Sequence, residues 1–334
     1  MCDACEQSLA SNTKRSSAQY ATLATGLFPM QQNLRNRKPQ VDMTQDLHRV
    51  PGSRPPLEIA RVMDAEQQFS GRRPLGDRMR SALRTLSDEV NWLWCDPPTQ
   101  AYAVAAPRRG GIDLELVADP TNLSAGIELL DLVCDRMPTG RLWTHGDKSS
   151  GRTAAEANGL EKERELWLMS RDLTDPITVP QPPAGFRFRL FRPGIDDISW
   201  LELNRKAFES LPDQGSWTAA DLQTRLTADW YDPNGFFVAD YDGQLAGFHW
   251  TKMETSGSTT TPATGEVFLI ATAEEYRGSG ISEPLLLAGL EYLQRQGAHQ
   301  AHLFVDSSNS RAASFYAKSG FEHRDSDRCF GWKR

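Results

Sequence analysis

A short glycine-containing segment near the C-terminus has the residue types that hold a phosphate group. It reads RGSGIS, residues 277–282, and joins a strand-like apolar run at 266–272 to a helix-like run that begins near Pro284. Glycine lets the backbone come close to a ligand and adopt positive φ. A helix start offers unpaired N–H groups at the positive end of the helix dipole. The segment therefore predicts a phosphate or pyrophosphate site.

Two familiar phosphate-binding motifs are excluded at this loop. No Gly-Lys-Ser/Thr follows it, as a P-loop requires, and Gly278-x-Gly280 lacks the third glycine of a dinucleotide fingerprint. Taken alone, an ordinary glycine turn explains the segment about as well as an anion site. The interpretation therefore depends on the elements around it.

Alternating strands and helices are expected to position this loop. Asp242-Gly243 between two apolar runs predicts a hairpin, and Thr218 predicts the N-cap of a helix. A loop is expected at 211–217. The expected elements are a strand at 186–192, helices at 196–209 and 218–230, a hairpin at 235–253, the strand at 266–272 and a helix from about 284.

Changes in composition divide the chain into two blocks. Residues 1–50 are polar with almost no hydrophobic periodicity, which predicts a disordered tail. The proline-rich stretch at 173–185 predicts an extended linker. A first domain at 51–172 and a second at 186–334 remain, and both are of ordinary domain size.

The two blocks end with a similar succession of elements. RLWTHGD (141–147) and HLFVDSSN (302–309) are each followed by a helix-like stretch, a Gly-apolar stop and a final strand. An ancient duplication is the simplest interpretation. The alternative is the strand–helix alternation found in any α/β protein.

Composition excludes several classes of function. A net charge of −7 argues against nucleic acid as the main partner, because that role needs a basic face. No apolar run is long enough to span a membrane, and no signal peptide is recognisable. Five scattered cysteines suit a reducing compartment, so a cytoplasmic protein is expected. The six histidines lack metal-ligand spacing, so no metal is expected.

The loop and the helix after the next strand resemble the GCN5-related N-acetyltransferases. Arg277-x-x-Gly280-x-Ser282 is similar to that family's Gln/Arg-x-x-Gly-x-Gly/Ala loop, with serine in the last position. Asn309 and Tyr316 resemble the Asn-x-x-Ala pattern and the tyrosine of the following helix. The resemblance implies an α/β fold with a mixed α+β sheet, and acetyl-CoA as the co-substrate.

A closer resemblance is to the mycothiol synthases, tandem-domain acetyltransferases of actinobacteria. It is carried by Phe208, by 213–215 with Trp217, by GFFVADYDGQLAGFHWTK (235–252) and by GEVFLIA (265–271), and it extends more loosely over the first block. It implies two tandem domains of this family, the first degenerate. It also implies acetyl transfer to the cysteinyl amine of cysteinyl-glucosaminyl-inositol, the last step of mycothiol synthesis.

The resemblance assigns Glu266 as general base on the amine and Tyr316 as general acid on the departing CoA sulfur. A primary amine is largely protonated at neutral pH, so a carboxylate must remove its proton, directly or through water. No Cys–His pair stands at a motif position, which favours direct attack without a covalent intermediate. The alternatives are an exposed strand-end charge for Glu266 and a core ring for Tyr316.

The resemblance also assigns three segments to acetyl-CoA. The end of the strand should separate from its neighbour, so that its backbone binds the pantetheine arm. The loop should hold the pyrophosphate, and the start of the last helix should line the other side. The expected residues are Ile270, Ala271, Thr272, Arg277, Gly278, Ser279, Gly280, Ile281, Ser282, Glu283, Asn309, Ser310, Arg311, Ala312, Ala313 and Ser314.

For the acceptor, the resemblance indicates Asp213, Lys252 and Glu266, whose opposite charges suit a polyhydroxyl ligand. Lys252 as a solvated strand charge is the alternative. Phe304 stands where the family has a substrate-contacting tyrosine, so one hydroxyl contact is lost. Asp77 in the first block is also assigned to the acceptor cleft.

The first block has lost the loop motif that the resemblance requires. Leu123-x-x-Gly126-x-Glu128 stands in its place, and Glu128 brings negative charge to the expected pyrophosphate position. We expect this block to hold no acetyl-CoA tightly and to do no chemistry. It should serve as a scaffold and as one wall of the acceptor cleft.

Two other functions stay open on the sequence. One is an acetyltransferase acting on another amine, such as a protein N-terminus or an aminoglycoside. The other is a non-catalytic acetyl-CoA-binding regulator, which would not need Glu266 and Tyr316 together. The expected partner is a small thiol-sugar acceptor, with no nucleic acid and no membrane, and the chain is expected to be a monomer.

Overall fold

The computed structural model describes residues 46–85, 88–95, 100–108, 110–209, 211–254 and 263–334. The tail expected at 1–50 lies outside the described residues up to position 45. For residues 47–50 the expectation of disorder is wrong, because Leu47–Pro51 forms strand β1, paired antiparallel with β2 (Asn91–Cys95). An edge strand of this kind takes its hydrogen bonds from a neighbouring strand, so it needs no strong periodicity of its own.

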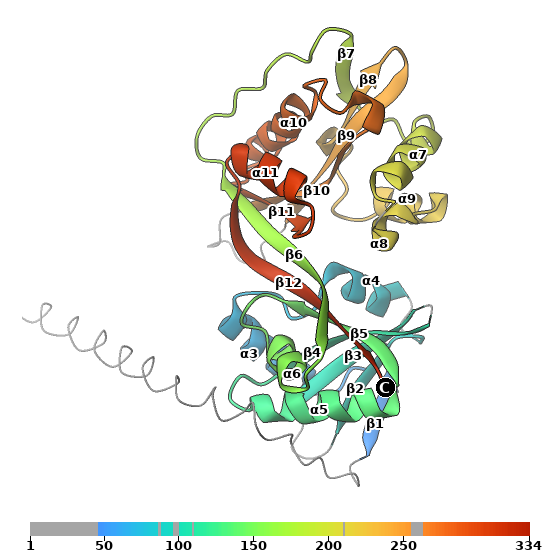
Figure 1. The fold of residues 1–334 in the computed structure, drawn as a ribbon, viewed down its shortest axis with the longest axis vertical. Helices are drawn as coiled ribbons and strands as arrows, with labels where there is room; N and C mark the ends of the chain where they lie inside the picture. The colour runs from blue at the N-terminus through green and yellow to red at the C-terminus, as the bar shows by residue number, and fades with distance from the viewer. Residues whose placement is uncertain (1–45, 86–87, 96–99, 109, 210, 255–262) are drawn as a thin grey trace, which may run out of the picture. The chain divides into compact units, whose positions relative to one another are not determined.

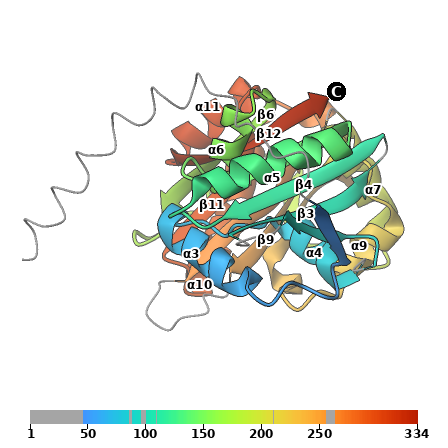
Figure 2. The same ribbon diagram turned by 90° about the horizontal axis from the view of Figure 1, so that it is seen from below.

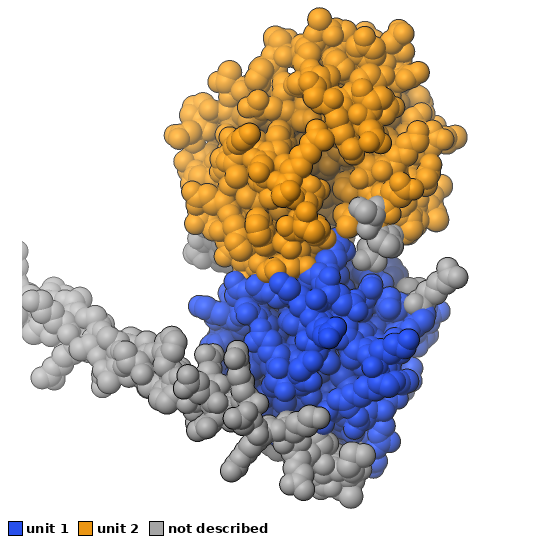
Figure 3. All heavy atoms as spheres, viewed as in Figure 1, with its two compact units in different colours: residues 1–164, 327–334 blue, residues 165–326 orange. Residues whose placement is uncertain are grey.

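The chain forms two compact units whose boundaries differ from those expected from the sequence. Unit 1 contains residues 1–164 and 327–334, and unit 2 contains residues 165–326 (Figure 3). The last part of β6 (Glu161–Asp172) pairs with β11 (Gln300–Asp306) in unit 2. The last part of β12 (Glu322–Lys333) pairs with β5 (Thr139–His145) in unit 1. Each unit therefore completes its sheet with a strand from the other half of the sequence.

Unit 1 is a mixed sheet with helices on both faces. Its strand order is β1-β2-β3-β4-β5-β12, with β4 and β5 parallel. One core lies under α5 and α6, with α5 running along β3 and β4 (Figure 2), and a second core lies under α3 and α4. The remaining elements are α3 (Ile59–Ser70), α4 (Asp77–Thr85), β3 (Ala101–Arg108), β4 (Gly111–Ala118), α5 (Leu123–Arg136) and α6 (Ser150–Ala157).

Unit 2 has the same plan. Its strand order is β6-β11-β10-β9-β8-β7, with β10 and β11 parallel. Helices α10 and α11 cover one face, and α7, α8 and α9 lie over the other (Figure 1). The elements are β7 (Phe186–Leu190), α7 (Asp197–Ala207), α8 (Pro212–Gly215), α9 (Ala219–Leu226), η1 (Pro233–Gly235), β8 (Phe236–Tyr241), β9 (Gln244–Glu254), β10 (Thr264–Thr272), η2 (Glu274–Tyr276), α10 (Ser282–Arg295) and α11 (Ser310–Lys318).

Local signals in the sequence predict several of these elements correctly. Thr218 caps α9 in a capping box with Asp221, and Asp242 and Gly243 have φ of 50° and 80° in the hairpin turn. The loop expected at 211–217 instead contains the short helix α8, which Pro212 begins at a position where its missing N–H costs nothing. Among the described residues, no helix is long and apolar enough to cross a membrane.

The feature that shapes the site is a separation of two parallel strands in unit 2. Among the described residues, β10 pairs with β11 only from Thr264 to Glu266, while its pairing with β9 continues to Thr272. A bulge between Val267 and Leu269 accompanies the change. The expected separation of the end of β10 from its neighbour is therefore observed. The main chain beyond Glu266 is left open to a ligand on the β11 side.

Candidate active site

Glu266 lies at the point where β10 and β11 separate. The register places it opposite Lys252 on β9 and opposite His302 on β11. Lys252 Nζ donates to Glu266 Oε2 at 3.1 Å, and each side chain is 12% exposed. A mostly buried carboxylate at the point where two strands separate can accept a proton from an amine that binds there.

Aromatic rings surround the Lys252 ammonium. Lys252 Nζ lies 5.5 Å from the Trp230 ring centroid and 5.8 Å from that of Phe268. Trp217 packs on Phe268, and the Arg225 guanidinium lies 3.6 Å from the Trp217 ring. No sequence motif marks Phe268 as a site residue, although it follows Glu266 by two residues on β10 and packs beside Trp217 and Lys252.

The glycine loop fits an anionic group. Gly278 and Gly280 have φ of 83° and 87°, which only glycine adopts without strain. Among the described residues, no hydrogen-bond acceptor is found for the N–H groups of Gly278, Gly280 and Ile281. Ser279 Oγ is likewise buried without a described partner. A pyrophosphate would satisfy these donors at the start of α10.

Side chains at the ends of the neighbouring elements hold this loop in place. Thr272 Oγ1 and Ser282 Oγ lie 2.9 Å apart, which ties the end of β10 to the first residue of α10. Arg277 is half exposed and pairs with Glu274 at 3.5 Å. Its guanidinium can therefore reach an anion from the solvent side of the loop.

Tyr316 lies in α11, among Phe315, Phe321 and the core beneath the helix. Burial raises the pKa of its phenol above the ordinary value, so the hydroxyl stays protonated at neutral pH. A protonated phenol can donate a proton to a leaving thiolate. At the start of the same helix, Asn309 accepts from the Ala312 N–H and so serves as the N-cap.

Three other residues are expected to contact the acceptor. Phe304 is 39% exposed on β11 and meets the His302 ring edge-on at 6.0 Å. Asp213 belongs to α8, but its side chain lies outside the described set. Asp77 begins α4 in unit 1 and pairs with Arg80.

The corresponding strand position in unit 1 is Glu115. Pairing of β4 with β5 ends there, as pairing of β10 with β11 ends at Glu266. The Glu115 carboxylate accepts from the Gly76 N–H at 2.9 Å and lies 3.3 Å from His145 Nε2. His145 Nδ1 in turn lies 2.8 Å from Asp327. Although burial alone would lower it, pairing with Glu115 and Asp327 raises the pKa of His145 to about 10.

Unit 1 has internal hydrogen bonds at the end of β4 and in the turn that follows it. Ala118 at the end of β4 donates its N–H to Ser150 Oγ of α6 at 2.9 Å. The turn before α5 is held by the buried Asp119 carboxylate, which accepts from Thr121 and Arg61. Gly126 lies inside α5, where an added Cβ would meet Ala118 at 3.0 Å. No glycine loop of the kind seen in unit 2 is formed by these residues.

Known proteins resemble this chain in sequence and in fold. Residues 198–321 match the acetyltransferase (GNAT) family. A mycothiol acetyltransferase of Thermobispora bispora is 42% identical over 269 residues, which are 79% of this chain and 91% of that protein. Another, of Acidothermus cellulolyticus, is 34% identical over 295 residues, 80% of this chain and 88% of that protein. A solved tandem GNAT protein from the clavulanic acid biosynthesis pathway superposes with a TM-score of 0.60 at 18% identity, covering 86% of this chain and 98% of that one.

The class follows from these matches together with the fold. The second unit is a GNAT domain, and the protein is an acetyl-CoA-dependent N-acetyltransferase. Its identity to relatives over most of their length places it more narrowly: the chain belongs to the mycothiol acetyltransferases. The family resemblance and the mixed α/β fold expected from the sequence are both confirmed.

Proposed function

We propose that the protein transfers acetyl from acetyl-CoA to the cysteinyl amine of cysteinyl-glucosaminyl-inositol and so completes mycothiol. The observation that carries the proposal is the position of Glu266, beside Lys252 and at the opening between β10 and β11. The family membership supplies the acceptor, since relatives of this length are named mycothiol acetyltransferases.

The cofactor residues are those around the strand gap and the glycine loop. Acetyl-CoA supplies an activated acetyl group as a thioester. The free edge at 270–272 would bind the pantetheine arm, residues 277–283 would surround the pyrophosphate, and 309–314 would line the other side. The open N–H groups at Gly278, Gly280 and Ile281 support this assignment.

Two side chains move protons in the proposed reaction. Glu266 accepts the amine proton, directly or through water, as the amine nitrogen forms its bond to the acetyl carbon. Tyr316 then donates its phenolic proton to the departing sulfur, for which its raised pKa keeps it protonated. Lys252, Asp213 and Phe304 would bind the acceptor, with Lys252 also orienting Glu266. Asp77 of unit 1 would also contact the acceptor.

We further propose that unit 1 binds no acetyl-CoA tightly and does no chemistry. The support is that Ser150 and Asp119 already engage the groups a cofactor would need. Isothermal titration of the full chain should give one tight acetyl-CoA site. Two tight sites per chain would contradict this assignment.

The acceptor is tested by direct turnover. The full chain is incubated with acetyl-CoA and cysteinyl-glucosaminyl-inositol while CoA thiol release and product mass are followed. Acetylation of the cysteinyl amine is expected. We further expect the protein to be cytoplasmic and monomeric. Turnover with a protein N-terminus or an aminoglycoside instead would favour the alternative acceptor, and acetyl-CoA binding without turnover would favour a regulator.

A further inference from the structure

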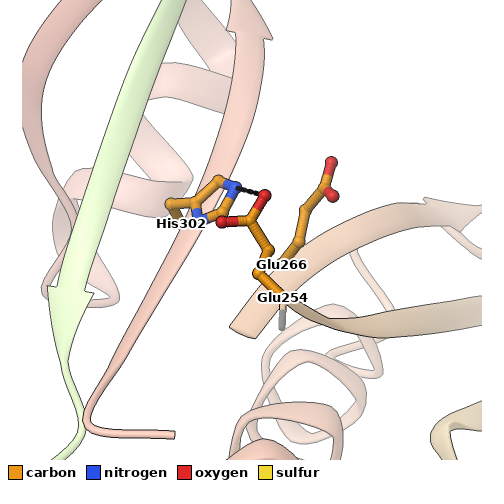
Figure 4. Close-up of side chains that lie close together, drawn as sticks. All are labelled: Glu254, Glu266 and His302. Atoms are coloured by element: carbon orange, nitrogen blue, oxygen red, sulfur yellow. Dashed lines mark ion pairs between the residues drawn. The ribbon is translucent and has the colours of Figure 1, made fainter. Parts of the chain in front are cut away.

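Three side chains with metal-binding atoms meet on one side of unit 2's sheet. Glu266 and His302 are opposite each other on β10 and β11, and Glu254 on β9 is opposite Thr264, two residues before Glu266. Positions two apart on a strand point to the same face, so the register brings all three side chains together. Figure 4 shows them as a group, with His302 next to Glu254.

The donor atoms are close enough to share one ion. One atom from each residue lies within 4.8 Å of the others, and His302 Nε2 is 4.0 Å from Glu254 Oε1. Ligand atoms around a tetrahedral zinc ion are separated by about 3.3 Å, given bonds of about 2.0–2.2 Å. Small rotations of the side chains would close the difference. The side chains of Glu266 and His302 are each 12% exposed and that of Glu254 is 33% exposed, which leaves an approach from solvent.

The donor set selects the kind of ion. Zinc accepts both imidazole nitrogen and carboxylate oxygen as ligands, and three protein ligands would leave a further position for water or another ligand. Magnesium and calcium prefer oxygen ligands alone, so the imidazole disfavours them. Two carboxylates against one lysine also leave excess negative charge, which attracts a cation.

Lys252 opposes metal binding at the same place. Its ammonium is 3.1 Å from Glu266 Oε2 and would repel a divalent ion on the same carboxylate. Glu266 Oε1 can still face the ion while Oε2 keeps the lysine. Affinity should therefore be weaker than in a structural zinc site, and it should rise when the ammonium is removed.

We propose that Glu254, Glu266 and His302 form an inhibitory site for a divalent transition-metal ion, of which zinc is the best match. The ion is not a cofactor of the transfer. It would occupy the lone pair with which Glu266 accepts the amine proton, and so would compete with the reaction. The spacing of histidines in the sequence does not reveal the site, because the three proposed ligands lie on three different strands.

Direct metal binding tests the proposal without relying on acetyl transfer. Equilibrium dialysis of the full chain against zinc chloride should show one site per chain. His302→Gln and Glu254→Gln should each weaken zinc binding at least tenfold, whereas His299→Gln and Glu275→Gln, both exposed, should not. Lys252→Met should tighten zinc binding, a change opposite to that expected from a damaged fold.

Inhibition provides the second measurement. Zinc should inhibit acetyl transfer by the wild-type chain, and a chelator should restore it, with both effects reduced in His302→Gln. Wild-type protein that binds no zinc would overturn the proposal. So would equal zinc affinity in wild type, His302→Gln and Glu254→Gln, or weaker binding in Lys252→Met. Because binding is measured apart from turnover, a wrong acceptor would not affect the result.

Discussion

Glu266 is the residue on which the proposed chemistry depends. It is held by Lys252 on one side and faces His302 on the other, and it marks the last paired residue between β10 and β11. The loop can be predicted from the sequence because its residues are contiguous, and Glu266, on the strand before the loop, can be predicted through the family resemblance. Glu254 and His302 cannot, since only strand register brings them to it.

Replacing Glu266 by Gln should lower kcat about 10²- to 10⁴-fold, because the amide cannot accept the amine proton. Acetyl-CoA affinity should be unchanged, since the pyrophosphate loop is untouched. Steady-state kinetics with isothermal titration of acetyl-CoA checks both. Glu275→Gln, at an exposed position in η2, is the matched control. Undiminished transfer in Glu266→Gln would contradict the general-base assignment.

At the scale of elements, one strand does most to create the site. β10 stays paired to β9 throughout but leaves β11 after Glu266, and its end is tied to the start of α10 by Thr272 and Ser282. The glycine loop between them depends on positive φ at Gly278 and Gly280. The geometry of the proposed cofactor site is therefore a property of the strand–loop–helix unit.

Gly280→Ala should raise the Kd for acetyl-CoA about tenfold. A Cβ at a φ of 87° costs about 1–2 kcal/mol. The strained loop would leave the conformation in which its open N–H groups can bind the pyrophosphate. Gly243→Ala, at a φ of 80° in the hairpin turn, should lower stability but leave this Kd unchanged. Titration of acetyl-CoA into both variants decides, and equal affinities would show that the loop conformation does not matter.

In unit 1 an ion-pair network joins β4, β5 and β12 through Glu115, His145 and Asp327. The pKa of His145 is raised from 6.5 to about 10 in the fold, so protonated His145 stabilises the folded state. This contribution is complete below about pH 6.5 and is lost as pH rises towards 10. Glu115 in this network and Glu266 in unit 2 both lie where the pairing of two parallel strands ends.

His145→Gln should therefore flatten the decline of unfolding free energy between pH 6.5 and 10. Urea unfolding at several pH values measures the slope, which for one proton is at most about 1.4 kcal/mol per pH unit. His299→Gln, at an exposed position, should keep the wild-type slope. The same slope in both variants would be evidence against the network.

At the scale of the whole chain, the two units exchange strands. Residues 165–172 of β6 complete the sheet of unit 2, and residues 327–333 of β12 complete that of unit 1. The proline-rich stretch at 173–185 therefore separates the two sequence blocks but not the two compact units. We therefore expect the stable folding of each unit to require the strand that comes from the other half of the sequence.

A fragment of residues 165–326 should unfold cooperatively, whereas a fragment of residues 186–334 should not. The second fragment lacks the β6 strand that pairs with β11, and it carries the end of β12 without β5. Thermal unfolding followed by circular dichroism compares the two. Cooperative unfolding of 186–334 alone would show that the exchanged strands are dispensable.

The local features of this protein follow from its sequence alone. The glycine loop, the Thr218 cap and the Asp242-Gly243 turn each depend on residues a few positions apart, so their patterns are visible in the sequence. The lateral pairing of the strands is visible only in the folded protein. That pairing set the separation at Glu266, brought His302 and Glu254 beside it, and exchanged β6 and β12, because register depends on hydrogen bonds between segments that are distant in sequence.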